Sequence, residues 1–169
     1  MTFSPYLRLG LIALVATLVL DQAVKLALLH LVQIETRGLI VVAPFLDLVM
    51  AWNPGISFGL FPQDSMLGQW VLIAFKAIAV GAIGLWLIKA ETAWIALGLG
   101  LIAGGAVGNG IDRLLYGAVA DFFAFHITTA TWSFRWYVFN LADVAIVAGV
   151  ALLLYESLVP NRVDASKSS

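Results

Sequence analysis

The sequence lacks the residues on which most hydrolytic sites depend. It contains no cysteine and only two histidines, His30 and His126. The absence of cysteine excludes disulfide bonds, a thiolate nucleophile and sulfur-ligated metals, and the histidines match no zinc-binding motif. No GxSxG nucleophile elbow is present, and Ser57 has no evident base beside it, so we interpret Ser57 as structural. We therefore expect neither a metal nor another cofactor.

Charged side chains are also scarce. They make up 11% of the 169 residues, against 62% hydrophobic residues, and the mean hydropathy is +1.00. Soluble domains carry roughly 25% charged residues, so the expected solvent is a lipid bilayer. The net charge is only -1 and the basic residues are scattered, which argues against nucleic acid as a partner.

Four apolar runs are each long enough to cross a hydrocarbon core of about 30 Å. They cover residues 9–31, 70–88, 94–111 and 138–159. The first run is not interpreted as a cleavable signal peptide, because Asp21 and Lys25 interrupt it and no small-residue cleavage site follows. We expect one all-α membrane domain with four transmembrane helices.

Two polar connections, 32–69 and 112–137, separate these runs. Within the first connection, residues 39–42 and 46–52 are rich in β-branched and large apolar side chains, which predicts short strands. The expected fold therefore includes a small β-containing region outside the membrane. The serine-rich tail at 160–169 is typical of disorder.

Four spans would place both termini and the 89–93 link on one side of the membrane. That side carries a weak excess of basic residues: Arg8, Lys89, Arg162 and Lys167, against Arg37, Arg113 and Arg135. The positive-inside rule then favours cytoplasmic termini and places both large connections outside. Tryptophans near the expected span ends fit an aromatic belt: Trp70, Trp86, Trp94, Trp132 and Trp136.

Ionisable residues inside a span cost at least about 2.5 kcal/mol each near its centre, so each needs a partner or a task. Asp21 and Lys25 are four residues apart, and this spacing fits both a structural ion pair and a direct role in a site. Lys76 lies near the outer end of the second span, where we interpret it as a side chain that extends to the surface.

The densest polar cluster lies at the outer end of the third span. Gly104 and Gly105 fit close packing between helices in lipid. Asn109 and Asp112 share a helix face, and Asp112 can pair with Arg113 or with a neighbouring helix. Both a structural network and a functional site fit this arrangement.

Two further carboxylates are expected at the same membrane surface. Asp121 lies among large apolar residues, and Asp143 shares a face with Asn140 at the start of the fourth span. Two neighbouring carboxylates that hold one proton between them can activate water without a metal, as in aspartic proteases. The spacing alone does not decide whether Asp112 or Asp121 is the partner of Asp143.

Five motifs, in this order, carry a family resemblance: LDQAVK at 20–25, NPGISFG at 53–59, GGAVGNGIDR at 104–113, VADF at 119–122 and FNLADVAI at 139–146. Together they resemble the lipoprotein signal peptidase (signal peptidase II) family of bacteria over nearly the whole chain. The resemblance implies that Asp121 and Asp143 are catalytic. It implies supporting or substrate-binding roles for Asp21, Lys25, Asn53, Gly55, Asn109, Asp112, Arg113 and Asn140.

The resemblance also implies an aspartic endopeptidase of the bacterial cytoplasmic membrane, with its site on the periplasmic side. Such an enzyme removes signal peptides from diacylglyceryl-modified prolipoproteins just before the lipidated cysteine. Lipidated precursors, membrane lipid and the inhibitor globomycin are the implied partners, and we expect a monomer. In one departure from the family, the stretch between Asp121 and Asp143, with TTAT at 128–131, is slightly longer.

A small proton- or ion-transporting membrane subunit is the main alternative, because intramembrane Asp and Lys residues also mark ion paths. Two features count against it: the carboxylates gather at one face instead of the midplane, and no inverted repeat is visible. A purely structural role as a membrane scaffold would not explain the polar motifs.

The expected topology predicts which positions an impermeant thiol reagent reaches. Because the chain has no cysteine, a single Thr129→Cys or Ser169→Cys substitution gives a unique labelling site. In intact cells, we expect the reagent to label the first variant and not the second, as judged by gel shift. The reverse pattern would contradict the topology.

Overall fold

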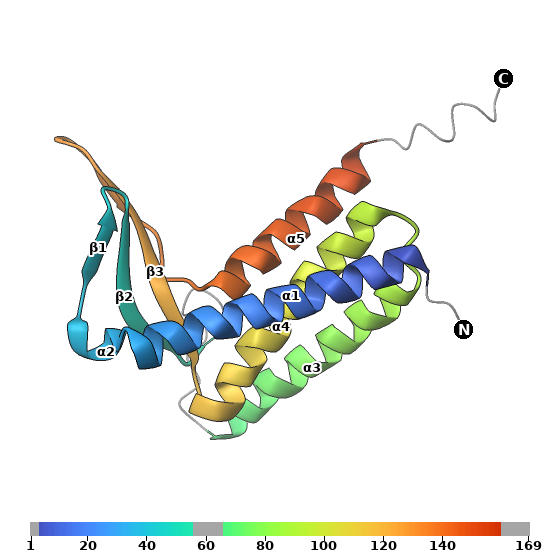
Figure 1. The fold of residues 1–169 in the computed structure, drawn as a ribbon, viewed down its shortest axis with the longest axis horizontal. Coiled ribbons are helices and arrows are strands. Elements are labelled where there is room, and N and C mark those ends of the chain that lie inside the picture. The colour runs from blue at the N-terminus through green and yellow to red at the C-terminus, as the bar shows by residue number, and fades with distance from the viewer. Residues whose placement is uncertain (1–3, 56–65, 160–169) are drawn as a thin grey trace.

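The computed structural model describes residues 4–55 and 66–159, so the tail at 160–169 and Ser57 lie outside the described residues. Its helices are α1 (Pro5–Leu26), continued by the π-helical turn η1 (Ala27–Leu31), then α2 (Ile34–Arg37), α3 (Met66–Ile88), α4 (Ala93–Tyr116) and α5 (Leu141–Leu158). Four of these elements, α1 with η1, α3, α4 and α5, are long and apolar enough to cross a membrane. They form one bundle (Figure 1).

Local capping explains where the long helices begin and end. Ser4 and Thr92 each accept a hydrogen bond from a backbone N–H in the first turn of α1 and α4. α4 ends at Tyr116 and is capped by Gly117, whose φ of 74° is in the left-handed region that favours glycine. This end lies five residues beyond the expected residue 111, so Asp112 and Arg113 belong to the helix and not to the connection.

The fourth expected span also begins later than residue 138. α5 starts at Leu141, and Asn140 caps it: the Asn140 side chain accepts from the Asp143 backbone N–H while the Asp143 carboxylate accepts from the Asn140 N–H. This reciprocal capping fixes the Asp143 side chain at the first turn of the helix.

An antiparallel sheet lies at one end of the bundle (Figure 1). It consists of β1 (Ile40–Ala43), β2 (Leu46–Asn53), β3 (Val119–Thr128) and β4 (Ser133–Arg135), in that spatial order. The two strands predicted in the first connection are confirmed. The sequence did not predict β3, because nearly all of its first six residues are buried and the apolar–polar alternation that marks a half-exposed strand is lost.

Helix α4 packs against α1, α3 and α5. Glycines bring the backbones into contact: a Cβ on Gly104 would lie 2.6 Å from the Leu14 carbonyl oxygen of α1, and one on Gly105 would lie 2.5 Å from that of Ala142 in α5. The packing interpretation of both glycines is therefore confirmed. Close approach of the three helices brings the end of α1, the end of α4 and the start of α5 together beneath the sheet.

Candidate active site

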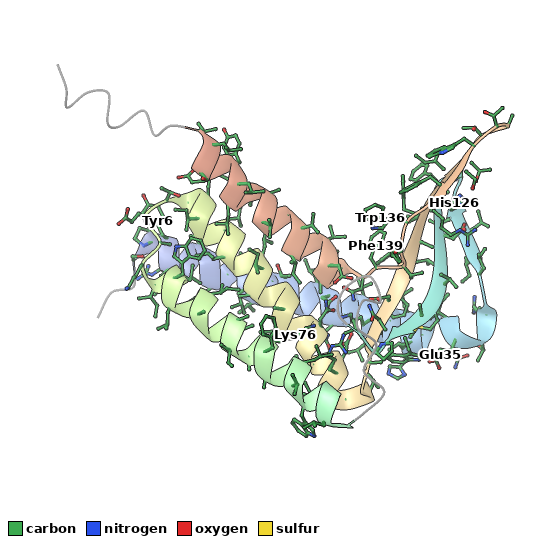
Figure 2. The ribbon with its side chains drawn as sticks, turned by 180° about the vertical axis from the view of Figure 1, so that it is seen from behind. Tyr6, Glu35, Lys76, His126, Trp136 and Phe139 are labelled. Carbon is green, nitrogen blue, oxygen red and sulfur yellow. The ribbon has the colours of Figure 1, made fainter. Side chains whose placement is uncertain are left out.

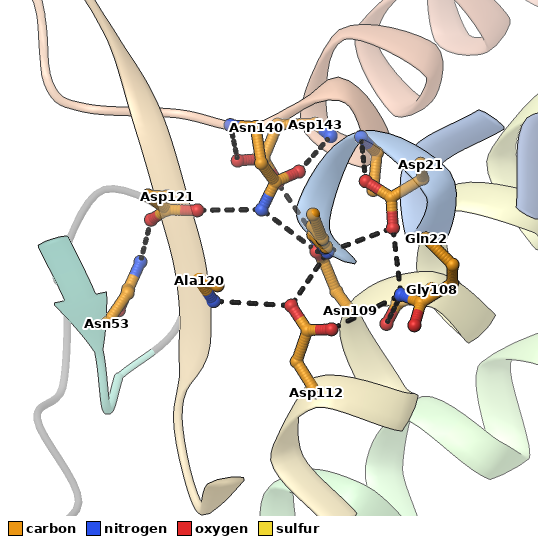
Figure 3. A network of polar contacts seen from close by, with 12 residues as sticks. Asp21, Gln22, Asn53, Gly108, Asn109, Asp112, Ala120, Asp121, Asn140 and Asp143 are labelled. Carbon is orange, nitrogen blue, oxygen red and sulfur yellow. Dashed lines mark hydrogen bonds and ion pairs between the residues drawn. The ribbon is translucent and has the colours of Figure 1, made fainter. Parts of the chain in front are cut away.

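Polar side chains from α1, α4, β3 and the start of α5 meet where the bundle joins the sheet (Figure 3). Asp21 and Asn140 are 0% exposed and Asp121 is 2% exposed. The other buried members of this cluster are Lys25, Asn109, Asp112 and Arg113. Polar groups shielded to this degree are stable only when they are paired, and each of these side chains has partners.

The Lys25 ammonium lies at the centre of the cluster. Its Nζ is 2.9 Å from Asp21 Oδ2 and 2.7 Å from Asp112 Oδ2, and it donates to Asn109 Oδ1 at 3.1 Å. These three contacts match the three donors of an ammonium group. The Asp21–Lys25 ion pair is thus present, and the partner of Asp112 is Lys25 of the neighbouring helix α1.

The two carboxylates bound to Lys25 also anchor backbone. Asp21 Oδ1 accepts from the N–H of Ala142 in the first turn of α5 at 2.9 Å, where the helix dipole favours negative charge. Asp112 Oδ2 accepts from the N–H of Ala120 in β3 at 3.2 Å. Ala142 and Ala120 are the immediate neighbours of Asp143 and Asp121 in the chain. The ion pairs therefore position both segments that carry the candidate catalytic residues.

Gln22 belongs to the same network and was missed among the candidate residues. Its Nε2 donates to Asp21 Oδ2 at 3.2 Å, to Asp112 Oδ1 at 3.2 Å and to the Gly108 carbonyl at 3.3 Å. The search for ionisable residues inside the spans could not find Gln22, because its side chain is neutral. Its position inside the LDQAVK motif was the signal that could have identified it.

Two asparagines connect Asp121 with Asp143. Asn140 Nδ2 donates to Asp121 Oδ1 at 2.6 Å, and Asn109 Nδ2 donates to Asp143 Oδ1 at 2.9 Å. Asn140 Nδ2 also donates to Asn109 Oδ1 at 3.0 Å. The structure therefore brings Asp121 and Asp143 into one hydrogen-bonded unit, whereas Asp112 faces Lys25.

The residues after β2 reach the same cluster from the sheet. Asn53 Nδ2 donates to Asp121 Oδ2 at 3.2 Å, and Asn53 Oδ1 accepts from the Gly55 N–H at 3.1 Å. Arg113 donates to the carbonyl of Pro54 at 3.1 Å and to that of Gly55. Arg113 thus holds the backbone that presents Asn53 to Asp121.

Burial raises the pKa of the Asp121 carboxyl to about 7, and the nearby Asp143 carboxylate acts in the same direction. The hydrogen bonds from Asn53 and Asn140 oppose this rise. Asp121 can therefore hold a proton near neutral pH, and a protonated carboxyl beside another carboxylate can act as a hydrogen-bond donor and acid.

The described ranges contain no cluster of three His, Cys, Asp or Glu side chains arranged to ligate a metal. His126 lies in the sheet, where its Nε2 is 3.1 Å from Asp47 Oδ2. Asp21 and Asp112 already share Lys25.

Two cavities open onto the carboxylate pair from different sides. An apolar groove of about 360 Å³ runs along α5 from Asp143, and its walls include Trp136, Phe139, Val147 and Ala148. Figure 2 shows Trp136 and Phe139 where the sheet meets the start of α5. A second pocket, of about 390 Å³, contains Asp121, with Trp52, Asn53 and Tyr137 among its walls. One cavity thus borders Asp143 and the other borders Asp121.

Comparison with known proteins gives a consistent result. The model of the family described as signal peptidase (SPase) II matches residues 13–159. The lipoprotein signal peptidase of Nitrobacter hamburgensis is 53% identical over 162 residues, which cover 96% of this chain and 98% of that protein. One from Rhodopseudomonas palustris is 51% identical over 152 residues, 90% of this chain and 93% of that protein.

A solved structure described as a bacterial membrane enzyme has a similar fold. Its TM-score is 0.73 at 24% sequence identity, and the match covers 90% of this chain and 92% of that one. This likeness concerns the arrangement of the helices and the sheet.

Removal of the central cation should destabilise the fold strongly. Lys25→Met leaves the buried carboxylates of Asp21 and Asp112 without a counter-charge, which costs about 3–5 kcal/mol. Thermal unfolding in detergent should show this loss. The control is Lys89→Met, which removes an exposed lysine between α3 and α4 and should change stability by no more than about 0.5 kcal/mol. Equal stability of the two variants would contradict the central role of Lys25.

Proposed function

The chain belongs to the signal peptidase II family, and we propose that it removes the signal peptides of diacylglyceryl-modified prolipoproteins as an aspartic endopeptidase. The cut falls just before the lipidated cysteine. The observation that carries the proposal is the pair of the buried Asp121 and the half-buried Asp143, oriented by asparagines and bordered by an apolar groove and a sheet-side pocket.

In the proposed reaction, the pair holds one proton and binds a water molecule. The raised pKa of Asp121 favours it as the protonated partner, which donates a hydrogen bond to the scissile carbonyl oxygen. Asp143 accepts a proton from the water as the hydroxyl adds to the carbonyl carbon. The same proton then passes to the leaving amine of the lipidated cysteine as the C–N bond breaks. The products are a free amine and a carboxylic acid, which keeps the second proton of the water until it ionises in solution.

The surrounding residues orient the pair and exchange no proton. Asn109 and Asn140 donate through amide groups, which neither gain nor lose protons near neutral pH. Arg113 holds the carbonyls of Pro54 and Gly55, which keeps Asn53 against Asp121. These roles agree with the supporting functions that the sequence motifs implied.

The two cavities suggest how the substrate lies. The groove along α5 is lined almost wholly by apolar side chains and suits the acyl chains of the diacylglyceryl group. The pocket beside Asp121 contains Asn53 and Pro54 and suits the peptide. Globomycin, a cyclic peptide with the same access, would compete there. The family relationship gives no support to the transporter alternative.

We also propose that the four apolar helices all span the bacterial cytoplasmic membrane, as parts of a single domain. The termini would be cytoplasmic and the sheet periplasmic, so that the site faces the side where lipidated precursors emerge. A monomer contains every residue of the proposed site.

Asp121→Asn and Asp143→Asn should each abolish cleavage and leave the protein folded and inserted. Asparagine has nearly the same shape as aspartate, but its amide can neither accept the proton of water nor act as an acid. The assay incubates the purified protein with a lipidated precursor and follows the mass loss that equals the signal peptide. Because the two act as one unit, the double variant should be no less active than either single variant.

Asp112→Asn is the control for this assignment. It weakens the contact with Lys25. Its main effect should therefore be a lower unfolding temperature and not a loss of kcat. If Asp112→Asn were inactive and stably folded while Asp121→Asn retained near-parental turnover, the pair would have to be reassigned to Asp112 and Asp143.

A bulky side chain in the α5 groove should impair lipid binding. Ala148→Phe narrows this groove and should raise KM for the lipidated precursor by about tenfold, roughly 1.4 kcal/mol of binding free energy, with kcat within about twofold. The control is Val150→Phe, at a position on the same helix that is 44% exposed and outside the groove. If both variants had the parental KM, the groove would not hold the acyl chains.

A further inference from the structure

Lys76 is an ionisable group that the mechanism above does not use. It lies on α3 in the wall of a groove of about 440 Å³ between α3 and α4, and the other walls include Ile73, Val80, Ala106 and Ile111. Figure 2 marks its position on α3. Across the described ranges, no carboxylate lies within ion-pair distance of its Nζ.

The depth of Lys76 makes this ammonium costly. It lies six residues after Trp70, where the apolar stretch of α3 begins, and a helix rises about 1.5 Å per residue, so it is about 9 Å along that stretch. An unpaired charge at such depth needs a task or a compensating charge. Extension to the surface, the interpretation from the sequence, does not account for a side chain that lines a groove against α4.

The charges that act on Lys76 all belong to the candidate site. They are Asp112 and Arg113 from α4, Lys25 from α1 and Asp143 from α5. Lys25 and Lys76 are cations that act on Asp143, and Arg113 interacts with it as well. Lys25 is already neutralised by Asp21 and Asp112 in direct ion pairs. No carboxylate of the described residues forms such a pair with Lys76, so its charge acts on the carboxylate pair.

Lys76 balances the charges of the cluster. The cluster holds four carboxylates, Asp21, Asp112, Asp121 and Asp143, and three cations, Lys25, Arg113 and Lys76. With one proton on the pair, three negative charges face three positive ones. Without Lys76, one negative charge would be left over, and an uncompensated charge is expensive in a shielded site. A second proton on the pair would then restore neutrality.

We propose that Lys76 is the charge-balancing residue that keeps the Asp121–Asp143 pair in its singly protonated, active state at neutral pH. The inference rests on the proposed function, because it concerns the same pair. Lys76 acts through Asp143 and is a positioning residue; no proton passes through it and it need not touch the substrate.

The sign of the effect follows from electrostatics. A nearby cation favours the ionised form of a carboxylate, so its removal lets the pair hold protons to higher pH. A doubly protonated pair has no base and is inactive. Removal of Lys76 should therefore move the acid limb of the activity profile to higher pH, and the alkaline limb should move in the same direction.

The test measures kcat with a lipidated precursor from about pH 5 to about pH 9 in detergent micelles. Lys76→Met removes the charge and keeps much of the apolar volume, and we expect its acid limb to shift upward by about 0.5–1 pH unit. At the acid end, this shift is a loss of roughly three- to tenfold. Lys76→Arg should retain the parental profile because arginine keeps the charge. Lys89→Met, which removes an exposed lysine outside the cluster, should also retain it.

An acid limb of Lys76→Met within about 0.2 pH unit of the parent would overturn the inference, whether the rate is parental or uniformly lower. If Lys76→Met does not insert stably, Lys76→Gln carries the same test. A failure of the proposed function would give a different result, because Asp121→Asn or Asp143→Asn would then still cleave the precursor.

Discussion

The rest of the site depends on one interaction, the Lys25 ammonium held between the carboxylates of Asp21 and Asp112. A buried ion pair stabilises a protein only when its remaining hydrogen-bonding capacity is also satisfied. Here both carboxylates accept backbone N–H groups, one at the start of α5 and one in β3. The same charges that join α1 to α4 therefore also fix the two segments that bring Asp121 and Asp143 together.

Lys25 also determines how the asparagines point. Because Asn109 Oδ1 accepts from both Lys25 and Asn140, its Nδ2 faces Asp143. Asn140 Oδ1 accepts from the Asp143 backbone N–H, so its Nδ2 faces Asp121. Each amide can satisfy its neighbours in only one orientation. The Lys25 cation thus sets the hydrogen-bond direction of both amides, and each amide donates to one of the two carboxylates.

The sequence predicted the apolar helices, the first two strands and the gathering of carboxylates at one end of the bundle. It could not choose between Asp112 and Asp121, because that choice depends on long-range geometry. α4 continues past Asp112 and turns that residue toward α1, while β3 folds back to place Asp121 beside α5. The spacing of residues along the chain predicts neither of these positions. The choice of Asp121 over Asp112 therefore came from the family resemblance. Gln22 was missed for a related reason, since two of its three partners, Gly108 and Asp112, lie on another helix.

The position of the pair at the end of the bundle answers two opposed demands. The acyl chains of a lipidated substrate stay in the bilayer, whereas hydrolysis needs water. One carboxylate of the proposed pair begins a helix beside an apolar groove, and the other lies on a strand beside a pocket that also contains Asn53. Such a boundary site shields its charges from water on the lipid side, so the number of cations near it matters. Lys25 and Arg113 alone balance two carboxylates, and a third, ionised carboxylate that serves as a base requires a third cation. Lys76 acts on Asp143, and within the described part of the chain no carboxylate forms a direct ion pair with it.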